Sequence, residues 1–200
     1  MTRPLFIAHR GASAETPENT LAAFRRALAL GVDGIELDVQ VTRDGVSMVF
    51  HDATLVRLTG RRGRIAQFSR RELDAFRVRG EAIPALAEVL ALTRDRCVVQ
   101  VELKRGTPIA PVVETIRRAR AGAAVILASF ERELVAEARA RAPHLPRMLI
   151  HEGGGRGRPT SRARVQGLAS VLAALGAAGV SLDHQAIPSA EFIAALKCRG

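Results

Sequence analysis

The sequence predicts an α/β fold in which parallel strands alternate with helices. Short apolar runs alternate with segments of helical periodicity along most of the 200 residues. Polar, chemistry-bearing side chains stand at the ends of the apolar runs, as they do at the carboxyl edge of parallel sheets. The length is sufficient for one substantial core, so we expect a single domain over residues 1–200.

Six βα units are expected. The expected strands cover residues 5–9, 34–39, 98–103, 125–129, 147–151 and 179–183. The expected helices cover about 17–30, 69–76, 85–93, 109–121, 131–141, 165–175 and 189–197. Thr16 can cap the first helix, Pro17 and Glu18 suit its first turn, and Gly31 should end it. A (β/α)₈ barrel takes ~250 residues, so two arrangements stay open: an open doubly wound sheet, or a barrel lacking its last two units.

A hairpin is expected after the second strand. The few residues before the apolar run 47–50 include Asp44-Gly45, a hairpin signal, and are too few for a parallel crossover. This run should therefore fold back antiparallel and return His51 toward the second strand. The hairpin and the arginine-rich segment after it form a small insertion at about residues 40–80.

Composition excludes several function classes. The net charge is +10, but lysine stands only at 104 and 197. The charge therefore reflects a general preference for arginine along the chain. Tryptophan and tyrosine are absent, and no aromatic residues interleave with the basic stretches, so we expect no nucleic-acid partner. No apolar run is long enough for membrane insertion, and a cytoplasmic location is expected. Neither cysteine belongs to a CxxC pair, so we expect neither a zinc site nor a disulfide scaffold.

Three carboxylates suggest a metal site. Glu36 and Asp38 stand at i and i+2, so on a strand they share a face, and Glu102 ends the next parallel strand. Unpaired in one crevice they would repel one another, and a hard divalent cation, Mg²⁺ or Ca²⁺, would resolve that repulsion. Salt bridges to the many arginines are the alternative. We favour the metal because all three carboxylates fall at strand ends.

Histidines and cations at the same edge fit phosphate-ester chemistry. His9 and His51 are acid/base candidates, because the histidine pKa lies near neutrality. Arg10 can hold phosphate oxygens with two hydrogen bonds, and Lys104 places a compact ammonium beside a carboxylate. His144 is expected on the surface of a loop, whereas His151 and His184 are expected near the rim, where they could contact the substrate.

The motifs, taken in chain order, resemble those of the glycerophosphodiester phosphodiesterase family. They are His9-Arg10-Gly11, Pro17-Glu18-Asn19-Thr20, Glu36-Leu37-Asp38-Val39, Asp44-Gly45 with His51-Asp52, Ile83-Pro84-Ala85-Leu86 with Glu88, Glu102-Leu103-Lys104, and Ser129-Phe130. The resemblance is specific over residues 5–130 and looser beyond. It implies a (β/α)₈ TIM-type barrel that hydrolyses a small glycerophosphodiester to glycerol 3-phosphate and an alcohol, with Mg²⁺ or Ca²⁺.

The resemblance also implies a role for each candidate residue. The implied metal ligands are Glu36, Asp38 and Glu102. His9 and His51 would be the catalytic pair, Arg10 would bind the phosphate, and Lys104 would assist the anion. Which histidine is the acid, which alcohol is preferred and which oligomer forms stay open.

The chain departs from the family pattern at its end. Family members continue into a strand with a Trp-Thr-Val-Asn-like motif and a final strand near an Asp, whereas this sequence stops after about six of the eight units. We therefore expect a C-terminally incomplete barrel with unpaired edges, with marginal solubility and weak or no activity unless another chain completes it. Two other functions stay open: a phospholipase C- or D-like lipid phosphodiesterase, and a catalytically degenerate barrel that acts as a binding module.

Overall fold

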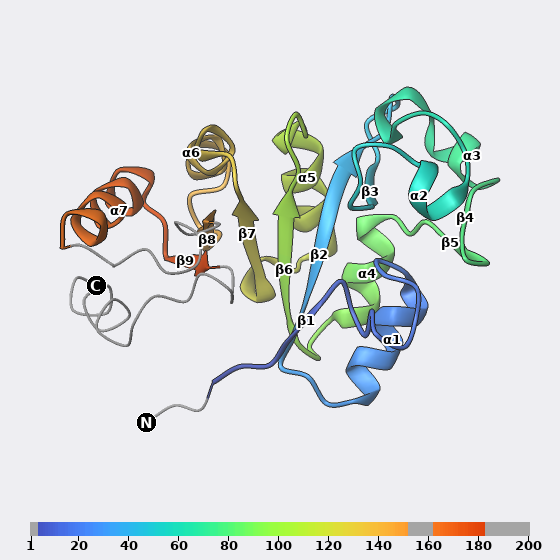
Figure 1. Cartoon of the computed structure of the whole chain (residues 1–200), viewed down its shortest axis with the longest axis horizontal. Helices are drawn as coiled ribbons and strands as arrows, with labels where there is room; N and C mark the ends of the chain where they lie inside the picture. Colours follow the sequence, from blue (N-terminus) through green and yellow to red (C-terminus); the bar gives the residue numbers. More distant parts are fainter. Residues whose placement is uncertain (1–3, 152–161, 183–200) are drawn as a thin grey trace.

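The structure is a computed structural model that describes residues 4–151 and 162–182 (Figure 1). The strands are β1 Ile7–His9, β2 Gly34–Val41, β3 Ser47–Val49, β4 Arg77–Val78, β5 Glu81–Ala82, β6 Val98–Leu103, β7 Val125–Ser129, β8 Arg147–His151 and β9 Gly179–Leu182. The helices are α1 Leu21–Ala29, α2 Val56–Thr59, α3 Arg70–Leu73, α4 Leu86–Thr93, α5 Ile109–Ala119, α6 Arg132–Arg141 and α7 Arg162–Leu175. Two 3₁₀ turns cover Ile65–Gln67 and Gly122–Ala124.

The strand order decides between the two arrangements. The main sheet runs β1-β2-β6-β7-β8-β9, with every neighbouring pair parallel, so each βα unit lies beside the one before it. A doubly wound sheet would reverse its order at a switch point. The sheet is curled and the helices line its outer side (Figure 1). The barrel-type α/β fold is confirmed, and within the described residues β1 and β9 are its edge strands.

Side chains of β2 alternate between the two faces of the sheet. Ile35, Leu37 and Val39 are fully buried and join the main hydrophobic core with side chains of α1, α4 and α5. Glu36 and Asp38 point to the opposite, inner face, because successive residues of a strand face opposite ways. The outer face of β2 therefore packs against the helices, while its inner face carries the two carboxylates.

The expected hairpin is confirmed. β3 pairs antiparallel with the end of β2, with Val49 opposite Val39. The segment that follows has a hydrophobic core of its own, formed by Met48, Phe50, Leu55, Ile65, Leu73, Val78, Ile83 and Ala85. This core anchors α2 and the β4–β5 pair, two elements whose runs are too short to show a period in the sequence.

The start of α1 differs from the prediction. Thr20, not Thr16, is the N-cap, and its hydroxyl accepts a hydrogen bond from the Ala23 amide over 3.2 Å. The residue before it, Asn19, has a left-handed φ of 58°, which a helix starting at residue 17 could not contain. Gly31, with φ +76°, follows the helix end as expected. The helix expected at residues 189–197 and His184 lie outside the described residues.

Candidate active site

The strand register brings the predicted carboxylates to one level of the sheet. His9 of β1 pairs with Glu36 of β2, and Asp38 pairs with Glu102 of β6. Glu36 and Asp38 do not end their strand, because β2 continues to Val41 where β3 pairs with it. Their neighbouring strands end near this level, so the carboxylates still face the open carboxyl edge of the sheet.

The three carboxylates form a buried cluster that fits a hard cation. Oxygen atoms of Glu36, Asp38 and Glu102 all lie within 4.8 Å of one another, and all three residues are buried. Glu36 Oε1 has no hydrogen-bond partner among the described residues. Burial, and then the negative charge of Asp38, raise the pKa of Glu36 to about 8. A divalent cation would give the free oxygen a partner and neutralise the cluster.

Lys104 supplies a cation at the edge of this cluster. Its ammonium lies 2.5 Å from Glu102 Oε1 and 3.3 Å from Asp38 Oδ1. Burial by itself would lower the pKa of Lys104, but the two carboxylates outweigh it and raise the pKa above its usual value. Burial raises the pKa of Glu102, and the hydrogen bond from Lys104 opposes this rise. Lys104 is therefore a charged, partly buried group beside the carboxylates.

The loop after β1 folds tightly around Arg10. The Arg10 amide donates to both the carbonyl oxygen and Oε2 of Glu36, each over 3.0 Å. Arg10 has a left-handed φ of 58°, and Gly11 follows with φ +79°. A Cβ atom on Gly11 would lie 2.8 Å from the backbone of Ala23, so this position requires glycine. The loop thereby fixes Arg10 against the carboxylate cluster.

Two side chains from the turn before α1 complete this corner. The Arg10 guanidinium donates from Nη1 to Glu18 over 2.9 Å, and its Nε lies 3.5 Å from Asp38 Oδ2. The Asn19 amide donates to the same Asp38 oxygen over 2.8 Å. Glu18 and Asn19 belong to the Pro-Glu-Asn-Thr motif, for which the sequence alone suggested no contact with the site.

The two candidate histidines flank the carboxylates differently. His9 Nε2 lies 3.8 Å from Glu36 Oε2, and 69% of its side chain is exposed. Partial burial, and then the positive charge of Arg10, lower the pKa of His9. His51 Nδ1 lies 2.7 Å from Asp52 Oδ1. Since an ionised carboxylate only accepts hydrogen bonds, Nδ1 carries the proton and Nε2 is available for chemistry.

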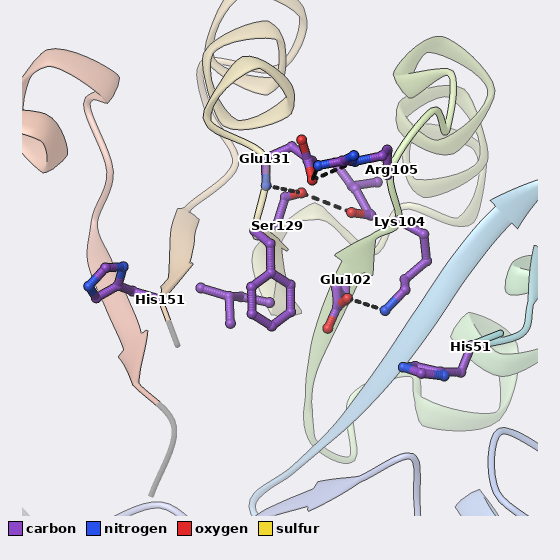
Figure 2. A pocket seen from close by; sticks show the side chains of 10 residues that line it. His51, Glu102, Lys104, Arg105, Ser129, Glu131 and His151 are labelled. Carbon is purple, nitrogen blue, oxygen red and sulfur yellow. Dashed lines mark hydrogen bonds and ion pairs between the residues drawn. The ribbon is translucent and has the colours of Figure 1, made fainter. Parts of the chain in front are cut away.

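A cavity of about 710 Å³ opens beside these groups (Figure 2). His51 faces Glu102 and Lys104 from one side, and His151 lies on the other side (Figure 2). His151 thus lies on the rim, as the sequence suggested. The Ser129 hydroxyl is occupied, because it donates to the Leu103 carbonyl over 2.9 Å and accepts from the Glu131 amide. Ser129 is therefore part of the wall.

The structure brings the seven predicted site residues together at one end of the sheet: His9, Arg10, Glu36, Asp38, His51, Glu102 and Lys104. It adds four residues that sequence reasoning assigned no role in the site: Glu18, Asn19, Asp52 and Arg57. The adjacency of Asp52 to His51 was the available signal for one of them. This arrangement can bind a divalent cation, hold an anion and transfer protons, which are the requirements of phosphate-ester cleavage.

Known proteins are similar to this chain in sequence and in fold. The model of the glycerophosphoryl diester phosphodiesterase family matches residues 9–200. A glycerophosphodiester phosphodiesterase of Caldanaerobacter subterraneus subsp. tengcongensis is 40% identical over 166 residues, 76% of this chain and 68% of the relative. The chain spans about two thirds of the length of such curated relatives.

Two solved structures are also similar. A glycerophosphodiester phosphodiesterase from Agrobacterium tumefaciens has a TM-score of 0.83 and 29% identity, with 99% of this chain and 84% of that chain covered. An Oleispira antarctica phosphodiesterase, solved with its product sn-glycerol 3-phosphate, has a TM-score of 0.85 and 27% identity, with 98% and 81% covered.

The fold and site define a barrel-type phosphodiesterase. The chain belongs to the glycerophosphoryl diester phosphodiesterase family, which confirms the resemblance read from the sequence. None of the helices in residues 4–151 and 162–182 combines the length and apolar character that crossing a bilayer requires.

Proposed function

We propose that this chain hydrolyses small glycerophosphodiesters to sn-glycerol 3-phosphate and an alcohol with the help of a divalent cation. Family membership and the product bound in the Oleispira relative support this substrate class. The observation that carries the proposal is the convergence of three buried carboxylates with Arg10, His9 and His51 on one edge of the sheet.

The metal ligands in this proposal are Glu36, Asp38 and Glu102. Their oxygen-only donor set suits Mg²⁺ or Ca²⁺, and the unpartnered Glu36 Oε1 is the strongest support for a ligand there. When bound, the cation supplies Lewis-acid stabilisation of charge on a phosphoryl oxygen.

Arg10 and Lys104 hold the phosphodiester. Both side chains carry fixed positive charge next to the carboxylate cluster, and both are mostly buried, so their attraction for an anion is weakly screened by solvent. Arg10 offers the fork geometry that suits two phosphate oxygens, and Lys104 acts as a point charge.

His9 and His51 move the protons. Attack at phosphorus by water forms one P–O bond, breaks the bond to the leaving alcohol and gives sn-glycerol 3-phosphate directly. Attack by the substrate's own glycerol hydroxyl expels the same alcohol but gives a cyclic phosphate, which a water must then open to sn-glycerol 3-phosphate. One histidine accepts the proton of the attacking oxygen, and the other gives a proton to the departing oxygen. The hydrogen bond from His51 Nδ1 to Asp52 leaves Nε2 for this transfer.

The test is release of sn-glycerol 3-phosphate from glycerophosphocholine in the presence of Mg²⁺ or Ca²⁺, with and without a chelator. We expect release that depends on the cation, is lost in Glu102→Gln and is retained in Glu114→Gln, a carboxylate on the exposed face of α5. Turnover of intact phosphatidylcholine instead would favour the lipid phosphodiesterase. A folded, cation-binding protein that cleaves neither would favour the binding module. The single-domain boundary and the cytoplasmic location stay predictions.

A further inference from the structure

A second carboxylate cluster lies beside the metal-binding one and holds an arginine. Ligand atoms of Glu18, His51 and Asp52 all lie within 4.8 Å of one another. These residues come from the turn before α1 and from the segment that follows β3. The guanidinium of Arg57, on α2 of the insertion, bonds to both carboxylates. In this cluster the positive charge that balances the carboxylates therefore comes from the Arg57 side chain.

Arg57 bonds each carboxylate through both oxygens. Its Nε and Nη2 donate to Asp52 Oδ2 and Oδ1 over 2.6 and 2.7 Å. Its Nη2 and Nη1 donate to Glu18 Oε1 and Oε2 over 2.8 and 3.1 Å. Such paired contacts need the planar fork of a guanidinium, which an ammonium cannot reproduce. Arg57 thus joins two chain segments that lie 34 residues apart, at positions 18 and 52.

Each of these carboxylates also touches a residue of the proposed machinery. Asp52 Oδ1 accepts from His51 Nδ1 over 2.7 Å. Glu18 Oε1 accepts from Arg10 Nη1 over 2.9 Å. The order of contacts is therefore His51, Asp52, Arg57, Glu18 and Arg10, with Arg57 at the centre.

We propose that Arg57 is a positioning residue that holds the proton-transfer group His51 and the phosphate-binding group Arg10 in a common geometry, acting through Asp52 and Glu18. This inference rests on the proposed function of His51 and Arg10. Without Arg57 the two carboxylates would face each other with one cation fewer, and each would keep only its bond to His51 or to Arg10. The hydrogen bonds from Arg57 also lower the pKa of Asp52 to about 2, so this carboxylate stays ionised, and able to accept from His51, in acidic solution as well.

The role is one of geometry more than of stability. Half of the Arg57 side chain is exposed, so solvent weakens its ion pairs, although their two-point geometry preserves part of their contribution to the free energy of unfolding. Losses of about 10–100-fold in activity are typical when a partner that orients a functional group is removed. Arg57→Ala should therefore lower activity strongly while the protein stays folded.

The first experiment compares steady-state kinetics of wild type, Arg57→Ala and Arg57→Lys. The control is Arg61→Ala, an exposed arginine of the same insertion. We expect Arg57→Ala to lower kcat/KM by about 10–100-fold, with added guanidinium ions restoring part of the loss and Arg57→Lys restoring less. The contacts through Asp52 and through Glu18 should have different kinetic effects. Asp52→Asn should act mainly on kcat, because Asp52 contacts His51, and Glu18→Gln mainly on KM, because Glu18 contacts Arg10. Arg57→Ala added to Asp52→Asn should cost kcat little more.

The second readout does not depend on turnover. ¹⁵N spectra of the His51 ring, assigned by comparison with His51→Ala, should show a protonated Nδ1 in wild type and in Arg61→Ala. In Arg57→Ala we expect a mixture of the two tautomers. Near-wild-type kinetics together with an unchanged ring spectrum in folded Arg57→Ala would overturn the proposal. A wild type without turnover would refute the proposed function, while the ring spectrum would still decide whether Arg57 orients His51.

Discussion

The Asn19 side chain ties the turn before α1 to the middle of β2, because its amide donates to Asp38 Oδ2 over 2.8 Å. Asn19 is buried, with 2% of its surface exposed, and its φ is 58°. One residue therefore meets two demands. Its side chain orients a proposed metal ligand, and its backbone takes a left-handed conformation that asparagine tolerates better than most residues.

Substitutions at Asn19 should separate these two demands. Asn19→Gly keeps the backbone conformation but removes the hydrogen bond to Asp38 Oδ2, which should cost about 1–3 kcal/mol of unfolding free energy. Asn19→Ala adds about 1 kcal/mol because alanine disfavours the left-handed region. Urea unfolding measures both. An Asn19→Gly variant as stable as wild type would show that the bond to Asp38 contributes nothing.

Gly11 should be far more sensitive to substitution than another glycine with positive φ. Gly11→Ala places a Cβ 2.8 Å from the backbone of Ala23, whereas a Cβ at Gly60, φ +68°, meets nothing within 4 Å. Gly60→Ala should cost about 1–2 kcal/mol for its backbone alone. Gly11→Ala should cost clearly more and lower activity, since the neighbouring Arg10 must shift. Equal losses in the two variants, measured by thermal unfolding, would contradict the close approach at Gly11.

The sequence predicted the repeating part of the fold well. The strands at 98–103, 125–129 and 147–151 have the predicted bounds, because their apolar β-branched runs are read locally. The contact between Arg57 and Glu18 could not be predicted, since it joins residues 39 apart on a surface where arginine is abundant. Thr16 and Thr20 are equally good caps by type, and the turn between them is fixed by contacts of Asn19 with Asp38 and Arg10 that are distant in sequence.

The stability of the metal-free protein should fall as pH rises, through Glu36. The folded-state pKa of Glu36 is about 8, above its usual value of 4.5, so the folded state holds an extra proton between these values. The stabilisation is fully present below about pH 4.5 and is lost as pH rises through 8. We expect a chelated wild-type protein to lose about 3 °C or more in Tm from pH 5 to 8, relative to Glu36→Gln. Added Mg²⁺ or Ca²⁺ should restore Tm most at the high end. Parallel Tm curves for the two proteins would contradict the raised pKa.

Lys104 should affect substrate binding and cation binding in opposite directions. Its ammonium contacts Asp38 and Glu102, so Lys104→Met removes a charge that repels a divalent cation from the same carboxylates. Calorimetric titration should show cation affinity equal to or higher than that of wild type. The KM for glycerophosphocholine should rise about 10-fold or more, because one charge that attracts the phosphate is gone. Loss of cation binding in Lys104→Met would instead make Lys104 a structural support of the carboxylate cluster.

The two histidines should each be required for turnover without being required for cation binding. His9 Nε2 lies 3.8 Å from Glu36 Oε2, and His51 lines the cavity beside Glu102. Both are therefore near the proposed metal site, but neither is one of its proposed ligands. Removal of a general acid or base typically costs at least about 10²-fold in kcat. We expect this loss in His9→Ala and in His51→Ala, with cation affinity near wild type. His144→Ala, at an exposed position between α6 and β8, is the matched control and should keep full activity. A histidine variant that retains near-wild-type kcat would remove that residue from the mechanism. A variant that also loses cation affinity would make that histidine part of the metal site.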